Sequence, residues 1–263
     1  MKETNDNFEL LDILGISSKG LEVSDTHDIY REMLKTAIDL RMDYCILNDI
    51  KNGKTNCAHE VLLDSSNDGL IMFAEGFRAS IFDKDKIINS FKSLVKRIIE
   101  KDRSIETENN RTLEPVIDIV VKKTKFDLQT DLNNSRFYEE VMRLRDKYAS
   151  DARDILSISY IDPSTEIALP YNFDVVENKV FDEDNDLADL KIELTNETAN
   201  NRHLLSGIHT FQIFSKKYLR VRLDTNSPHD SEAVINCGMS EDKLNKFRKL
   251  FNIIKTSAKT YEV

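Results

Sequence analysis

Apolar positions recur at helical spacing in four stretches of the chain. The first runs from Ser24 to about Asn48, the second begins at Asp83 and ends near residue 100, and the third spans Ser135 to Tyr148. A fourth follows Ser240 near the C-terminus. Steps of three and four residues place these side chains on one face of an α-helix. Each stretch is therefore predicted to be an amphipathic helix.

Between the first two helices the pattern changes. The apolar runs HEVLL (59–63) and LIMFA (70–74) flank a polar stretch that contains Asn67-Asp68-Gly69. Two short apolar runs around such a turn predict a β-hairpin. The polar run 101–111 has no periodicity and predicts a solvated loop.

Strand-like runs dominate the second half. The candidates are VIDIVV (116–121), ILSISYI (155–161), FDVV (173–176), LADLKIEL (187–194) and YLRVRL (218–223), with a helix expected over 198–211. The fold class expected is α+β, with helices in the N-terminal half and at the C-terminus and a mixed or antiparallel sheet in the C-terminal half. We expect a helix-rich region over 1–112 and an α+β region over 113–263, or one continuous domain.

The composition of the chain limits the kinds of catalytic site that it could contain. The chain has 263 residues, of which 32% are charged, and only seven glycines, none of them between Phe77 and Ser206. It contains no GxGxxG, GxxxxGK[ST] or GxSxG motif. Since these loops use glycine for close backbone approach, their absence argues against P-loop, Rossmann and α/β-hydrolase chemistry. No cofactor is expected.

Charge is unevenly distributed. The formal net charge is −10, which argues against broad contact with nucleic-acid phosphates. Segment 174–197 holds nine acids and two lysines, whereas segment 216–259 holds ten bases and five acids. The two segments form either two solvated faces or complementary surfaces, within one chain or between copies.

Cysteine usage and hydropathy indicate the cellular compartment of the protein. Cys45, Cys57 and Cys237 are widely spaced and form no CxxC pair, so neither a disulfide framework nor a zinc site is expected. No stretch approaches the roughly 20 apolar residues that span a bilayer, and the first ten residues lack the apolar core of a signal peptide. These features predict a cytoplasmic protein, or one made in a host cytoplasm and built into a virion.

The main functional hypothesis is a non-enzymatic structural or assembly protein. It would act through contacts with other protein subunits in a homo- or hetero-oligomer, for example as a head–tail connector or neck-ring subunit of a tailed phage. The apolar stripe of the last helix suits either the chain's own core or a partner helix. The interface candidates are Phe247, Phe251, Ile254, Lys246, Arg248, Asp182, Glu183 and Asp184.

The alternative is a metal-dependent nuclease. From residue 135 the expected order of helix, three strands, helix and strand resembles the PD-(D/E)xK nuclease core. The resemblance implies Asp174 and Asp189 as Mg²⁺ ligands and Lys191 as the residue that orients the attacking water. Two features depart from the family pattern: no proline precedes Asp174, and the acids before Asp189 would repel phosphate. Mg²⁺ and a nucleic acid are expected only under this alternative.

Overall fold

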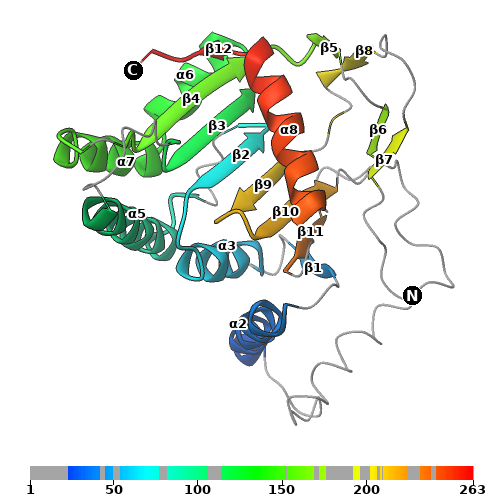
Figure 1. The fold of residues 1–263 in the computed structure, drawn as a ribbon. Helices are drawn as coiled ribbons and strands as arrows, with labels where there is room; N and C mark the ends of the chain where they lie inside the picture. Colours follow the sequence, from blue (N-terminus) through cyan, green and yellow to red (C-terminus); the bar gives the residue numbers. More distant parts are fainter. Residues whose placement is uncertain are drawn as a thin grey trace, which may run out of the picture.

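The computed structural model describes residues 23–41, 45–49, 54–76, 82–105, 114–151, 153–168, 172–175, 192–195, 202–205, 208, 210–223, 232–237 and 241–262. Its helices are α2 (Val23–Leu40), α3 (Lys54–Asp64), α5 (Asp85–Ile105), α6 (Lys125–Asn133), α7 (Arg136–Lys147) and α8 (Glu241–Ser257). With the strands they form an α+β fold built on a mixed sheet (Figure 1).

An eight-stranded sheet organises the molecule. Its order is β1 (Cys45–Asp49), β11 (Glu232–Asn236), β10 (Tyr218–Leu223), β9 (Phe211–Phe214), β2 (Leu70–Ala74), β3 (Ile117–Lys122), β4 (Leu156–Ile161) and β12 (Lys259–Thr260). Strands β2, β3 and β4 are mutually parallel, and every other pairing is antiparallel. Two small antiparallel pairs lie apart from it: β5 (Glu166–Ala168) with β8 (Arg202–Leu204), and β6 (Asn172–Val175) with β7 (Ile192–Thr195).

Helices cover both faces of the sheet. Figure 1 shows α8 crossing one face, while α3, α5 and α7 lie on the other. Alternation along the strands explains this division, because successive side chains point to opposite faces. On β2, Leu70 and Met72 belong to the larger apolar cluster, with α2, α3, α5, α6 and α7, whereas Phe73 joins α8 in the second cluster. The sheet is therefore buried on both sides in its centre.

Several predicted elements are confirmed. The long periodic stretches form α5, α7 and α8, and the strand-like runs form β3, β4 and β10. Ser135 caps α7, since its hydroxyl oxygen accepts a hydrogen bond from the N–H of Tyr138. Ser240, expected to cap α8, lies outside the described residues.

Other predictions are wrong. HEVLL belongs to helix α3, so the expected hairpin does not form, although LIMFA is β2. The first helix ends at Leu40, and part of its expected length is strand β1. Helix α5 extends to Ile105, into the expected loop 101–111. The helix expected over 198–211 is replaced, where the chain is described, by β8 and the start of β9.

The eight-stranded sheet crosses the boundary expected at residue 112. Strand β2 pairs with β3 on one side and with β9 on the other, and β1 pairs with β11. Strands from both halves of the chain thus share one sheet. Across the described ranges, none of the helices is both long and apolar enough to cross a membrane.

Candidate functional site

The parallel strands end together at one edge of the sheet, here called the carboxyl edge. It comprises Glu75-Gly76 after β2, Lys122 to Thr124 at the end of β3, and Asp162 to Ser164 after β4. In open α/β sheets, ligands bind outside the carboxyl ends of the strands, where loops can carry polar groups without disturbing the core. A ligand site is therefore expected at this edge of the sheet.

Lys122 brings a buried positive charge to the carboxyl edge. Its side chain is only 2% exposed, yet its ammonium forms an ion pair with Glu75, whose side chain is 39% exposed. The same nitrogen donates a 2.9 Å hydrogen bond to the carbonyl oxygen of Ile208 and lies 5.5 Å from the centre of the Phe73 ring. An ammonium out of water needs such partners, because the desolvation cost is large.

A second ion pair lies beside the first. Lys123 Nζ is 2.7 Å from Asp131 Oδ2 on α6, and both side chains are partly exposed. Gly76 makes room for this pair, since a Cβ there would lie 2.7 Å from both Asp131 Oδ2 and Lys123 Cε. The carboxyl edge thus holds two lysines whose charges are balanced by two carboxylates.

Helix α6 begins directly after these lysines. Thr124 is its N-cap: the hydroxyl accepts from the N–H of Asp127 at 3.3 Å and donates to the Asp127 carboxylate at 2.7 Å. Lys125 is exposed, and Phe126 beside it is 77% exposed. An aromatic ring left open among lysines at a helix N-terminus combines a flat apolar surface with positive potential.

The end of β4 adds a negative group to the same edge. Asp162 accepts hydrogen bonds from the hydroxyl and the backbone N–H of Ser164, at 2.6 and 2.9 Å. These two bonds hold the pKa of Asp162 below its usual value, so the carboxyl is charged at neutral pH.

The opposite, amino edge carries a denser network. Arg153, which is 8% exposed, donates to Asp68 and Asp102 at 3.1 and 3.2 Å, and Lys216 pairs with Asp68 and Glu114 at 3.4 Å. Burial raises the pKa of Asp68, but hydrogen bonds from the Gly69 N–H and Arg153, with the charge of Lys216, outweigh it and leave the pKa below its usual value. The network joins the turn before β2 to the segments before β3 and β4.

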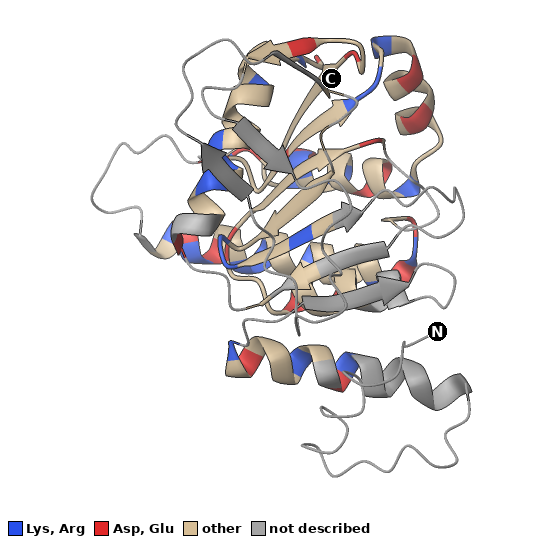
Figure 2. Ribbon diagram, turned by 90° about the vertical axis from the view of Figure 1, so that its right-hand side faces the viewer, with Lys and Arg blue, Asp and Glu red and all other residues tan. Residues whose placement is uncertain are grey.

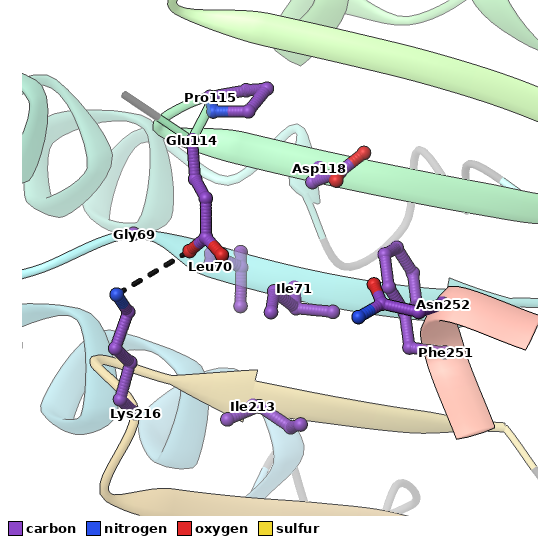
Figure 3. A pocket seen from close by; sticks show the side chains of 10 residues that line it. All are labelled: Gly69, Leu70, Ile71, Glu114, Pro115, Asp118, Ile213, Lys216, Phe251 and Asn252. Carbon is purple, nitrogen blue, oxygen red and sulfur yellow. Dashed lines mark ion pairs between the residues drawn. The ribbon is translucent and has the colours of Figure 1, made fainter. Parts of the chain in front are cut away.

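A shallow pocket opens beside this network. Figure 3 shows Glu114 and Lys216 paired at its rim, Ile71 and Ile213 on neighbouring strands, and Phe251 and Asn252 approaching from α8. Its charged rim groups are paired with each other, and much of its remaining lining is apolar.

Asp118 lines the same pocket and anchors α8 to the sheet. It forms an ion pair with Lys255, whose ammonium also lies 3.5 Å from the hydroxyl of Ser157 on β4. The three residues fix the last turn of α8 over β3 and β4.

Only Asp174, of the three residues of the nuclease alternative, lies in the described part of the chain. Asp174 lies on β6, in register with Glu193 of β7, while Asp189 and Lys191 fall outside the described residues. Strand β4 lies in the eight-stranded sheet and β6 in a separate pair, so the described strands do not form the single core sheet that this resemblance implies. No group of three or more His, Cys, Asp or Glu residues positioned to hold a metal ion occurs in the described part of the chain.

The interface candidates divide into three sets. Phe247, Phe251 and Ile254 are buried in the cluster beneath α8, which favours the core alternative for this stripe. Lys246 and Arg248 are partly exposed on the same helix. The acidic trio Asp182, Glu183 and Asp184 lies outside the described residues, so the proposed charge complementarity with α8 stays a prediction.

Sequence reasoning missed the carboxyl edge. The run Lys122-Lys123-Thr124-Lys125-Phe126 joins three lysines to an aromatic residue, and this was the available signal. Nothing in the pattern distinguishes the buried Lys122 from the exposed Lys125, or reveals that Phe126 points away from the core. Figure 2 shows that lysines, arginines and acids are interspersed along the described elements, so local geometry decides which charges matter.

No family model matches this sequence, and no curated protein matches it. Among solved structures, the archaeal chromatin protein TrmBL2, described with a novel mode of DNA binding, has a TM-score of 0.42 and 13% identity over 91% of this chain and 64% of its own. The phospholipase D family member Nuc from Salmonella typhimurium has a TM-score of 0.41 and 10% identity, over 83% of this chain and 98% of its own. NucT from Helicobacter pylori has a TM-score of 0.37 and 7% identity, over 82% and 98%. Such values describe a distant likeness in the course of the backbone, and no function follows from them.

Proposed function

We propose that this chain binds a single-stranded nucleic acid at the carboxyl edge. The observation that carries the proposal is the exposed ring of Phe126, the second residue of α6, which follows Lys125 directly and Lys123 by three positions. Bases stack on open aromatic rings whatever their sequence, and lysines contact the phosphates between them. The helix N-terminus adds positive potential on the same side.

The charge balance limits the strength of this binding. Lys123 is shared with Asp131, Glu75 faces Lys122, and the whole chain carries a net charge of −10. With about two phosphate contacts, the logarithm of affinity should fall with the logarithm of salt concentration with a slope of roughly −1.4. A short site at one edge, rather than a broad basic surface, is therefore proposed.

The direct test is fluorescence anisotropy with a labelled oligonucleotide of about a dozen bases, as DNA and as RNA, at low salt. Replacing Phe126 with Ala should weaken binding roughly 5- to 150-fold, because stacking contributes ~1–3 kcal/mol per base, whereas Phe126→Tyr should retain it. Leu40→Ala, at the other large apolar side chain left open in the described part, is the matched control. Equal affinity of the wild-type protein and Phe126→Ala would refute the proposal.

A more specific version of the proposal is that the chain also cleaves the strand that it binds. The same labelled strand, incubated with Mg²⁺ or Mn²⁺ and separately with EDTA, shows whether the chain hydrolyses what it binds. Metal-dependent cleavage that is lost in Asp189→Ala would support the nuclease alternative. A Phe126→Ala variant that loses self-association in mass photometry, with strand binding unchanged, would instead support the assembly hypothesis and overturn nucleic-acid binding.

A further inference from the structure

The two partners of the Lys122–Glu75 ion pair differ in their exposure to solvent. The ammonium is enclosed by the carbonyl oxygen of Ile208, the Phe73 ring and the strand itself, whereas the carboxylate is 39% exposed. Solvent therefore meets the carboxylate first. Any anion that approaches this lysine from the carboxyl edge must take the place of the Glu75 side chain.

We infer that Glu75 is a displaceable counter-ion that occupies the phosphate position of Lys122. This inference rests on the proposed nucleic-acid site and names the group that competes with its phosphates. A phosphate oxygen accepts the same charge-assisted hydrogen bonds from an ammonium as a carboxylate oxygen. When phosphate binds, the Glu75 side chain rotates into solvent, and the bond to the Ile208 carbonyl keeps the lysine in place.

One ammonium group defines the proposed phosphate position. Lys123 is held by Asp131 of α6 at 2.7 Å, whereas the ion-pair partner of Glu75 is Lys122. A phosphate at the Glu75 position therefore meets the ammonium of Lys122. The ligand class is a phosphate or phosphodiester group, which a nucleic-acid strand or free phosphate can supply.

The test uses inorganic phosphate as the probe, titrated by calorimetry into the full chain. Glu75→Gln keeps an oxygen acceptor for the ammonium but removes the competing charge, so phosphate should bind about tenfold more tightly than to wild type. Glu114→Gln, which removes a carboxylate from the ion pair with Lys216 at the opposite edge, is the control and should leave the affinity unchanged. In Glu75→Gln/Lys122→Met, which removes the whole pair, the gain should disappear.

Each outcome decides between the two proposals. Wild-type affinity for phosphate in Glu75→Gln would overturn the inference, while strand binding through Phe126 would leave the proposed function standing. Tighter phosphate binding by Glu75→Gln without any strand binding would support the inference and reject the proposed function. If thermal unfolding shows that Glu75→Gln is not folded, Glu75→Asp replaces it, because the shorter side chain withdraws the carboxylate from the ammonium and should give a smaller gain of the same sign.

Discussion

Two glycines at opposite edges of the sheet differ in what surrounds them. A Cβ at Gly69 would lie 2.8 Å from the carbonyl oxygen of Val116 and 3.1 Å from that of Pro115, both of them backbone atoms. At Gly76 the nearest atoms belong to the side chains of Lys123 and Asp131. An added Cβ at Gly69 cannot be accommodated unless a strand moves, whereas one at Gly76 can be accommodated by rotation of side chains.

We therefore expect unequal costs for alanine at these glycines. Gly69→Ala should lower the free energy of unfolding by about 1–3 kcal/mol, because overpacking displaces backbone. Gly76→Ala should lower it by under ~1 kcal/mol, the value of a partly exposed ion pair. Urea unfolding of both variants and the wild type provides the measurement, and equal losses would contradict the explanation.

The amino-edge network predicts a pH dependence. Asp68 has a folded-state pKa below its ordinary value of about 3.8, so its charged form stabilises the fold. This contribution is complete above the unfolded pKa and is lost as pH falls from about 3.8 through the folded pKa. Asp68→Asn should therefore destabilise the protein more at pH 7 than at pH 3, as measured by urea unfolding at both values. A constant difference would show that the charge of Asp68 does not matter.

At the scale of elements, α7 begins at a cap that also joins two helices. The Ser135 hydroxyl accepts from the N–H of Tyr138 and donates to Asp83 at 3.2 Å, and Asp83 also accepts from the N–H of Phe137 at 2.8 Å. A residue before α5 is thus bound to the first turn of α7. The cap fixes where α7 starts and how it meets its neighbour.

Removing this cap should destabilise the folded protein. Ser135→Ala is expected to lower the free energy of unfolding by ~1–2 kcal/mol, since a partly buried first-turn N–H loses its acceptor. Ser104→Ala, in the exposed last turn of α5, makes the same chemical change without a cap and should stay within about 0.5 kcal/mol. Thermal or urea unfolding compares them, and a similar effect of both changes would argue against the capping role.

Elements with long periodic patterns were predictable from the sequence, whereas the short run HEVLL was not. Seven buried side chains on one face specify α5 over much of its length, whatever lies around it: Ile87, Ile88, Phe91, Leu94, Val95, Ile98 and Ile99. HEVLL is five residues long, and so short an apolar run fits a strand or a helix equally well. Packing of Ala58 and Leu62, one helical turn apart, into the larger apolar cluster decides in favour of α3.

At the scale of the whole molecule, the last strand covers an edge. Strand β12 pairs with Ser159 and Tyr160 of β4, and the N–H of Tyr261 donates to the carbonyl oxygen of Ile158 at 2.8 Å. These contacts occupy part of the outer side of β4. An uncovered strand edge offers unpaired backbone groups to other chains.

Truncation after Ala258 should therefore have two effects. The loss of these few backbone hydrogen bonds should lower the free energy of unfolding by roughly 1–3 kcal/mol, and the uncovered edge should promote self-association. Urea unfolding and light scattering measure the two effects. Removing only Glu262 and Val263 is the control, and a stable, monodisperse truncated chain would refute the covering role.

The sequence by itself determined the α+β class and the elements whose periodicity extends over several turns or alternations, such as α7 and β10. It did not determine the carboxyl edge, because strands far apart in the chain must pair before their ends meet: β2 pairs with β3 and β9, and β3 with β4. Only this tertiary arrangement encloses Lys122 beside Glu75 and leaves Phe126, the second residue of α6, exposed. Residue type fixes what a side chain can do, whereas non-local packing fixes which of three similar lysines is enclosed and which face water.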